Sequence, residues 1–376
     1  MGAGPPRRDR TLLASFAERR AVLDRDSWGL ESFGSFTLEE RVSRYNAGNC
    51  DLAGGSWADR IMAEGEPGED PLLASIDLIL VTHLNLNLSP TSSARRHPMR
   101  QFAANLSILF PTLPYLERFR AAAESGFRAV ESWWPGDALA EGITADDIVR
   151  QAETYGLEMI LLNFAAGDMK AGDRGLAGDP DRVGAFRANV PVAIDLAHRL
   201  GCRKLNALAG NVLSEAGRSA QMELLVESVT FAADAAAAAG MSVMLEALNQ
   251  RETPRYLLPG TDVVLGLIER IGRPNVGFQL DVYHVAMAGE DPRDSIRRAG
   301  PRIGHVQLAD APGRHEPGTG ELPFLSILEE LDAARYSGPI GLEFAPLDPA
   351  APDFSCVERL GGRLSAPRTS DRRTER

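Results

Sequence analysis

Four oxygen-bearing side chains stand at the ends of successive apolar segments in the second half of the chain: Glu246, Asp281, Gln307 and Glu343. A single acid at the end of a strand commonly caps the next helix or forms a turn. Four such side chains in a row are difficult to explain as four separate caps. Carboxylates held close together repel each other, and a divalent cation that binds them all removes that cost. Oxygen ligands without cysteine favour Mg²⁺, with Mn²⁺ as the second choice.

The alternation of apolar and polar residues indicates that these four side chains point the same way. Successive side chains of a strand point to opposite faces. In the segment 276–281, Phe278 and Leu280 share one face and Asp281 lies on the other. The segments that carry the other three candidates alternate in the same manner. If the apolar faces pack against helices, all four polar side chains point inward at the carboxyl ends of their strands, where (β/α)₈ barrels build active sites.

Short apolar segments alternate with helical stretches through most of the chain. The expected strands are 102–108, 129–134, 158–164, 204–209, 242–248, 276–281, 303–309 and 340–345. The stretches between them include amphipathic or Ala-rich runs, and several end in Gly, a common helix stop. Eight such repeats over about 250 residues predict an α/β fold of the (β/α)₈ TIM-barrel type. A doubly wound sheet would show a Gly-rich phosphate loop after its first strand, and we find none.

The two ends of the chain differ in texture from the repeating part. The expected regions are an N-terminal extension (1–98), a barrel domain (99–350) and a C-terminal tail (351–376). The extension carries scattered charges and turn-formers, so we expect it to be largely disordered or loosely helical, with short helices near 11–23 and 37–45. Met99 is a candidate natural start of the working domain. The tail is charged and poor in apolar residues, which predicts a loose segment.

Composition narrows the class of protein and its partners. The 376 residues carry a formal net charge of −12, which argues against nucleic acid as the main partner. Three cysteines are widely spaced, form no zinc or redox pair and suit a reducing compartment. No segment reaches the roughly 20 apolar residues of a membrane span, and early charges exclude a signal-peptide core. We therefore expect a cytoplasmic protein without a membrane partner; a homo-oligomer stays open.

Further residues near the candidate ligands could contact a substrate or support the ligands. His305 lies one layer deeper in its strand than the ligand two residues later, so we expect it to support by hydrogen bonding rather than to bind the ion. For His284, just past Asp281, core packing and support of a ligand are both open. Arg314 and His315 lie in a Gly/Pro-rich loop, where substrate contact and simple solvation are both open.

Several motifs together resemble one family, the hydroxypyruvate isomerases among the xylose isomerase-like barrels. They are FAANLSILF, LNFAAGDMKAGDRG, LEALN, FQLDVYH, GHVQLAD, GRHEPGTGE and LEF, from about Met99 to about Pro346. The resemblance implies a divalent metal, commonly Mg²⁺, with these ligands: Glu246, Asp281, Gln307 and Glu343. It also makes the two glutamates proton donor and acceptor. The chain departs from the family at Ala247, where Pro is usual, and in lacking a full closing helix after the last strand.

The resemblance implies interconversion of hydroxypyruvate and tartronate semialdehyde, an intramolecular oxidoreduction of the aldose–ketose type. One glutamate would remove a carbon proton and the other would return a proton by way of an enediolate. The small keto-acid substrate is an anion, so a cationic group is expected nearby, and Arg314, Lys170 and Arg174 are candidates. The loop 313–321 has glycines that would let it act as a lid. We expect Trp133 and Trp134 to pack in the barrel wall.

Other functions remain to be weighed. An isomerase of 2-oxo-tetronate or a related keto acid would keep the same metal and glutamates. A metal-dependent lyase or dehydratase on the same barrel would share the ligands but act on a bulkier substrate. A DNA-repair endonuclease would use several zinc ions and many histidine ligands. This chain has six histidines, and only His284 and His305 lie close to the candidate ligands in the sequence. A non-catalytic binding protein would not need all four ligand positions filled by competent residues.

Overall fold

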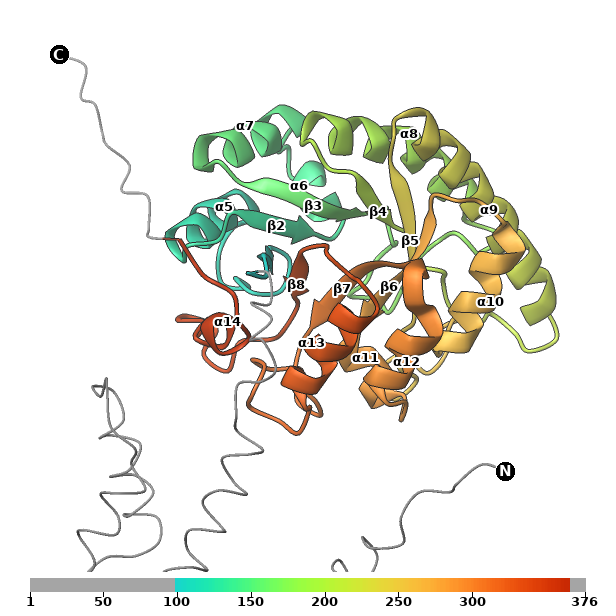
Figure 1. Ribbon diagram of the computed structural model, residues 1–376. Helices are drawn as coiled ribbons and strands as arrows, with labels where there is room; N and C mark the ends of the chain where they lie inside the picture. Colours follow the sequence, from blue (N-terminus) through green and yellow to red (C-terminus); the bar gives the residue numbers. More distant parts are fainter. Residues whose placement is uncertain (1–98, 366–376) are drawn as a thin grey trace, which may run out of the picture. The chain divides into compact units, whose positions relative to one another are not determined.

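The computed structural model describes residues 99–365 (Figure 1). The expected N-terminal extension, with its two short helices, lies outside the described residues, as do residues 366–376.

Eight parallel strands form a closed barrel in chain order (Figure 1), and the ring closes where β1 pairs with β8. The strands are β1 (Phe102–Asn105), β2 (Ala129–Ser132), β3 (Glu158–Asn163), β4 (Lys204–Asn206), β5 (Ser242–Glu246), β6 (Val276–Asp281), β7 (Ile303–Leu308) and β8 (Ile340–Leu342). The predicted (β/α)₈ barrel is confirmed.

Helices follow the strands and surround the barrel (Figure 1). They are α5 (Tyr115–Glu124), α6 (Gly136–Ala140), α7 (Ala145–Tyr155), α8 (Val183–Arg199), α9 (Arg218–Ala238), α10 (Thr261–Ile271), α11 (Val282–Met287), α12 (Pro292–Ala299), α13 (Phe324–Ala333) and α14 (Cys356–Arg359), with a 3₁₀ turn η1 (Gly300–Arg302). Helix α7 shows how the sequence sets the ends: Thr144 and Asp147 form a capping box, and Gly156 ends the helix in the left-handed conformation. None of the helices in the described range is long and apolar enough to cross a membrane.

Most strands are shorter than the sequence predicts, always at the carboxyl end. Strand β4 ends at Asn206 rather than at residue 209, and β8 ends at Leu342 rather than at residue 345. The reason is that the hydrogen-bonded ladder stops where the chain turns into the loop, while the apolar pattern continues into buried loop positions. Glu343 still donates its backbone N–H to the Leu308 oxygen at 3.1 Å, one step past the end of β8. Site residues thus sit at strand ends or just beyond them.

The C-terminal boundary lies further along the chain than the expected residue 350. Val357 and Leu360 are buried against the barrel core. The Ser365 backbone N–H donates to the Gly126 oxygen at 2.9 Å. The buried apolar residues that hold this segment are confined to positions 354–360, and the charged residues that follow them predicted a loose tail. The last helix, α14, has four residues, in agreement with the expected lack of a full closing helix.

Candidate active site

Hydrogen bonds between strands that are not neighbours show which side chains point into the barrel. Glu131 of β2 accepts from His305 Nε2 at 2.7 Å and from Gln307 Nε2 at 2.6 Å, both on β7. A Cβ atom built on Gly341 of β8 would lie 2.3 Å from Glu131 Oε2. These contacts cross the barrel interior. They agree with the alternation argument for β7, which placed His305 and Gln307 on the inward face.

Three of the four candidate ligands gather at the carboxyl end of the barrel. Glu246, Asp281 and Glu343 are each at most 4% exposed. One carboxylate oxygen each of Glu246 and Asp281 and a ring nitrogen of His284 lie within 4.8 Å of one another. Arg314 Nη2 lies 3.4 Å from Asp281 Oδ2 and 3.2 Å from Glu343 Oε2. One guanidinium therefore faces two of three buried acids.

The pKa values of the three acids are all raised. Burial, followed by repulsion from Glu343 and Asp281, raises the pKa of Glu246 well above its usual value. Burial raises the pKa of Glu343 to about 8, although Arg314 opposes this shift. Burial raises the pKa of Asp281 to about 6, against the opposing effect of Arg314 and of backbone N–H donors. Ionising all three acids therefore costs free energy unless a further positive charge, such as a cation, binds beside them.

The fourth candidate, Gln307, lies beside Asp281 in the β6–β7 register. Its Nε2 is held by Glu131, and its Oε1 accepts a hydrogen bond from Gln279 Nε2 at 2.6 Å. A carbonyl oxygen has a second lone pair, so this contact leaves one for a cation. Its role as a ligand stays a prediction.

The residues at the mouth fit a divalent cation. The cluster holds three buried carboxylates and one guanidinium, which contacts two of them. When all three acids are ionised, their negative charge exceeds the positive charge of the arginine. Two carbonyl oxygens, Asn206 Oδ1 and Gln279 Oε1, are buried and have no hydrogen-bond partner in the described part of the chain. A set of this kind, rich in hard oxygen donors, suits Mg²⁺ or Mn²⁺ better than Zn²⁺.

Both glutamates are held by donors that the sequence reasoning missed. Trp133 Nε1 donates to Glu343 Oε1 at 2.6 Å, and Asn105 Nδ2 donates to the same oxygen at 3.1 Å. Asn206 Nδ2 donates to Glu246 Oε2 at 2.8 Å. Trp133 was expected to pack in the barrel wall; its indole N–H also reaches the cluster, which that expectation did not include.

The signal for these residues was present in the early strands. Alternation applied to β1, β2 and β4, as it was to the late strands, places the missed polar residues at inward positions near the strand ends: Asn105, Glu131, Trp133 and Asn206.

The three candidate histidines have different surroundings. His305 is fully buried and donates to Glu131, the supporting role expected of it. His284 is 4% exposed, and its Nε2 lies 3.7 Å from Asp281 Oδ2, so it belongs to the cluster rather than to the apolar core. His315 Nδ1 donates to the Ala345 oxygen at 2.6 Å and so ties two loops together.

Only one of the three candidate cations faces the acids. Arg314 adopts a positive φ of 55°, and its guanidinium lies 5.2 Å from the centre of the Tyr283 ring. Its Nε is buried without a partner. Lys170 is instead paired with Asp137 at 2.8 Å, and its side chain is 86% exposed. Arg174 donates to backbone oxygens, and its charge contributes to the lowered pKa of His284, after burial and Arg314.

The loop expected to act as a lid is anchored at its base. The Asp310 carboxylate accepts the backbone N–H groups of Gly318 at 2.7 Å and Leu322 at 3.2 Å. Glu316 accepts the Leu347 N–H at 3.1 Å. Movement of this loop over the site stays a prediction.

Residues 119–359 match the protein family described as xylose isomerase-like TIM barrel. The chain belongs to this family.

Similar curated proteins are named as isomerases. A putative hydroxypyruvate isomerase from Streptomyces coelicolor is 42% identical over 264 residues, covering 68% of this chain and 95% of the relative. A 2-oxo-tetronate isomerase from Cupriavidus necator is 37% identical over 248 residues, covering 66% and 94%. A crystal structure from Brucella melitensis, described as an AP endonuclease of family 2, is 39% identical with a TM-score of 0.63, covering 66% and 95%. The chain is an isomerase of the xylose isomerase-like family.

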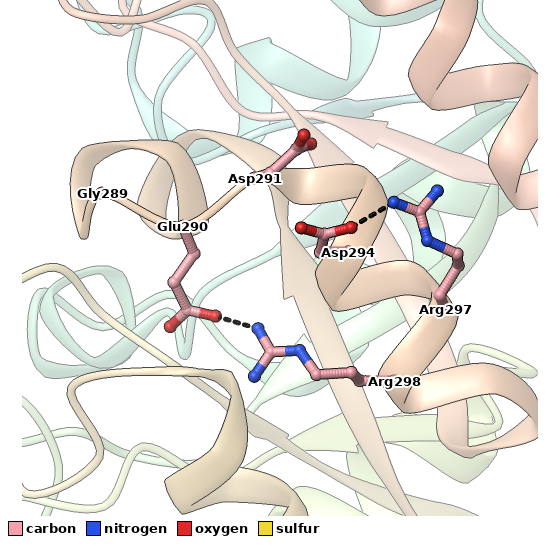
Figure 2. Close-up of a pocket in the computed structure, with 6 residues that line it drawn as sticks. All are labelled: Gly289, Glu290, Asp291, Asp294, Arg297 and Arg298. Atoms are coloured by element: carbon pink, nitrogen blue, oxygen red, sulfur yellow. Dashed lines mark hydrogen bonds and ion pairs between the residues drawn. The ribbon is translucent and has the colours of Figure 1, made fainter.

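A hollow of about 460 Å³ on the outer surface is separate from the candidate active site. Residues from the turn between α11 and α12 and from α12 line it: Gly289, Glu290, Asp291, Asp294, Arg297 and Arg298. Figure 2 shows two ion pairs among its side chains, Glu290 with Arg298 and Asp294 with Arg297. Asp291 is paired with Arg293 at 2.7 Å. None of the candidate site residues lines it, so we place the chemistry at the strand ends.

Proposed function

We propose that this protein is a metal-dependent keto-acid isomerase that interconverts hydroxypyruvate and tartronate semialdehyde. The observation that carries the proposal is the cluster of three buried acids with raised pKa values and one arginine at the mouth of the barrel. The curated relatives support the choice of reaction. Glu246, Asp281, Gln307 and Glu343 are the proposed ligands of Mg²⁺, or of Mn²⁺ in its place.

The reaction moves one proton between neighbouring carbons and exchanges the carbonyl and hydroxyl positions. A bound divalent cation would supply the positive charge that acidifies the C–H bond and stabilises an enediolate. Glu246 and Glu343 then share the proton work: one takes the carbon proton and the other returns a proton on the neighbouring carbon. The two residues exchange these roles when the reaction runs in reverse.

The contacts of the two glutamates suit this work. Trp133 and Asn105 fix one oxygen of Glu343, which leaves its other oxygen facing Arg314. Asn206 fixes one oxygen of Glu246. Because each carboxylate is held by one oxygen, the other can meet the substrate in a defined place.

Arg314 is the proposed partner of the substrate carboxylate. It faces the cluster, and its buried Nε–H has no hydrogen-bond partner among residues 99–365. A guanidinium presents several N–H donors in one plane and so binds a carboxylate through two bonds. The ring of Tyr283 supports the guanidinium from one side.

Two neighbouring functions use the same groups. An isomerase of 2-oxo-tetronate, as the Cupriavidus necator relative is named, needs only a larger pocket beside the same acids. A lyase or dehydratase would likewise keep the ligands. The endonuclease description of the Brucella melitensis structure raises a third candidate. However, the group of potential His, Cys, Asp and Glu ligands found in residues 99–365 contains a single histidine, which does not fit a centre of several zinc ions.

The deciding experiment offers metal-stripped protein each substrate class with and without Mg²⁺ or Mn²⁺. The substrates are hydroxypyruvate, a 2-oxo-tetronate and a duplex with an abasic site. We expect hydroxypyruvate to be isomerised, and chelator or Glu246→Gln to abolish this turnover. Faster turnover of the tetronate would reassign the substrate, and a dehydrated product would indicate a lyase. Turnover that persists in chelator would contradict the mechanism, and cleavage of the duplex would replace the function.

A further inference from the structure

His284 can serve the site in two incompatible ways. Its Nε2 lies at the carboxylate cluster, 3.7 Å from Asp281 Oδ2. If Nε2 carries a lone pair, His284 is a further metal ligand, as its distance to Glu246 and Asp281 allows. If Nε2 carries the proton, His284 is a hydrogen-bond donor and binds no metal. A neutral imidazole has one nitrogen of each kind, and the partner of Nδ1 decides which is which.

Asn249, in the loop after β5, is that partner. It is fully buried. Its backbone N–H points at His284 Nδ1 at 3.3 Å, and its side-chain Nδ2 lies 2.8 Å from the same nitrogen. A backbone N–H can only donate, so this contact already requires a lone pair on Nδ1. The side-chain amide adds a second donor, provided that its nitrogen rather than its oxygen faces the ring.

The orientation of the Asn249 amide is fixed by its other neighbours. The backbone N–H of Glu252 donates to Asn249 Oδ1 at 3.0 Å, and Asn249 Nδ2 donates to Glu252 Oε2 at 3.3 Å. Rotating the amide by half a turn would place its NH₂ group against the Glu252 N–H and its oxygen against the Glu252 carboxylate. Both contacts would then be repulsive, so the backbone N–H and the carboxylate of Glu252 favour the same orientation.

We infer that Asn249 is a positioning residue that fixes His284 as the Nε2–H tautomer, so that His284 donates a hydrogen bond into the acidic site and is not a metal ligand. The inference rests on the proposed function only for the use of the donor. The tautomer itself is inferred from the contacts between Asn249 and the His284 ring. The Nε2–H group then faces oxygens at the mouth, which are those of Asp281 or of a bound substrate.

Nuclear magnetic resonance of the metal-free, full-length protein with ¹⁵N-labelled histidine tests the tautomer directly. Two-bond ¹H–¹⁵N correlations distinguish a ring nitrogen that carries a lone pair from one that carries a proton, and the spectrum of His284→Gln assigns the signals. We expect Nδ1 unprotonated and Nε2 protonated near neutral pH. A protonated Nδ1 in the wild-type protein would overturn the inference, and this result depends on no variant except the one used for assignment.

Two variants of the loop test the role of Asn249. Asn249→Asp replaces the amide donor by an anionic acceptor at 2.8 Å, which outcompetes the longer backbone contact, so Nδ1 should become protonated. Glu252→Gln is the matched control, because it keeps the backbone N–H that orients Asn249, and it should retain the wild-type pattern. An unprotonated Nδ1 in Asn249→Asp, or a protonated one in Glu252→Gln, would contradict the assignment.

Metal affinity gives the second readout. We expect Mn²⁺ binding, followed by electron paramagnetic resonance of free Mn²⁺, to weaken about 10- to 100-fold in His284→Leu, as for a residue that supports a ligand. Asp281→Asn should weaken it clearly more, because that variant removes the charge of a proposed ligand. Equal losses in the two variants would make His284 a ligand and overturn the inference. Failure of isomerase activity with the expected tautomer would instead count against the proposed function alone.

Discussion

The surroundings of the buried Glu343 carboxyl act on its pKa in opposite directions. Burial raises its pKa to about 8, with help from Asp281 and Glu131, while Arg314 and the Trp133 N–H favour its charged form. The raising effects prevail, so the folded protein without metal holds the proton of Glu343 at a pH where an unfolded chain has lost it. Stability and pH are therefore linked through this residue.

The linkage predicts how the metal-free protein responds to alkali. A glutamate whose pKa is raised on folding stabilises the folded state fully below its unfolded pKa, and this contribution disappears as pH rises through about 8. We expect the melting temperature of metal-stripped protein to fall as pH rises from about 5 to about 8, because only the folded state keeps the proton in that range, and to level off above it. Scanning calorimetry should show a flatter dependence for Glu343→Gln, in which that proton is absent. Equal slopes for the two proteins would show that Glu343 does not hold the proton.

A second prediction at this scale separates the arginine at the mouth from the lysine at the surface. Arg314→Lys keeps the charge but loses the planar set of donors, and a hydrogen bond to a charged group contributes about 1.5–3 kcal/mol. We expect KM for the anionic substrate to rise by about 10- to 100-fold. Lys170→Met is the control: Lys170 is exposed and paired with Asp137, so steady-state kinetics should not change. A similar change in both variants would remove Arg314 from substrate binding.

At the scale of elements, β2, β7 and β8 meet through Glu131. Its carboxylate accepts from Asn105, His305 and Gln307, and Gly341 of β8 leaves the space that it fills. The same contacts hold the amide of Gln307, because its Nε2 is bound and its oxygen is left to face Gln279. Glu131, inside the barrel, thus orients the side chain of the candidate ligand Gln307.

Filling that space should damage the site without removing any site residue. A Cβ atom at residue 341 would lie 2.3 Å from one Glu131 oxygen and 2.6 Å from the other. Three hydrogen bonds fix this carboxylate, so it cannot move aside freely. We expect Gly341→Ala to cost about 1–3 kcal/mol in denaturant unfolding and to weaken Mn²⁺ binding.

Its control lies in a helix. Gly266 of α10 has open space where a Cβ atom would stand, so Gly266→Ala should stabilise by about 0.5–1 kcal/mol. A neutral effect of Gly341→Ala on both stability and Mn²⁺ affinity would show that Glu131 yields easily and that its bracing of Gln307 is weak.

Elements were the part of the molecule most open to prediction from sequence. Alternation identified eight strands and placed Asp281 at the end of β6, because a strand with one face on helices must repeat every two residues. The alternation of apolar and polar residues does not predict contacts made by loops. The bonds of Asn249 to His284 depend on how the loop after β5 folds, and no periodicity reports that. Arg314 was a candidate by its charge, but its place between two acids depends on an uncommon backbone angle.

For the whole molecule, the closed barrel needs a short segment beyond its eighth strand. The segment around helix α14 packs on the core through Phe354, Cys356, Val357 and Leu360. Gly362 pairs with Arg100 at the entry to β1. The start and the end of the described chain therefore brace each other on one side of the barrel. Composition placed the end of the folded unit at residue 350, and the structure places part of the core after it.

Truncation distinguishes the two boundaries. The fragment 99–365 keeps the closed barrel and the α14 contacts, so we expect it to fold with isomerase activity close to that of the full chain. The fragment 99–350 loses four buried side chains of the core: Phe354, Cys356, Val357 and Leu360. Burial of the three larger ones is worth together up to about 5–9 kcal/mol. It should unfold at clearly lower denaturant concentration, as circular dichroism would report. Equal stability of the fragments would return the boundary to residue 350. Failure of 99–365 to fold while the full chain is active would assign residues outside it a structural role.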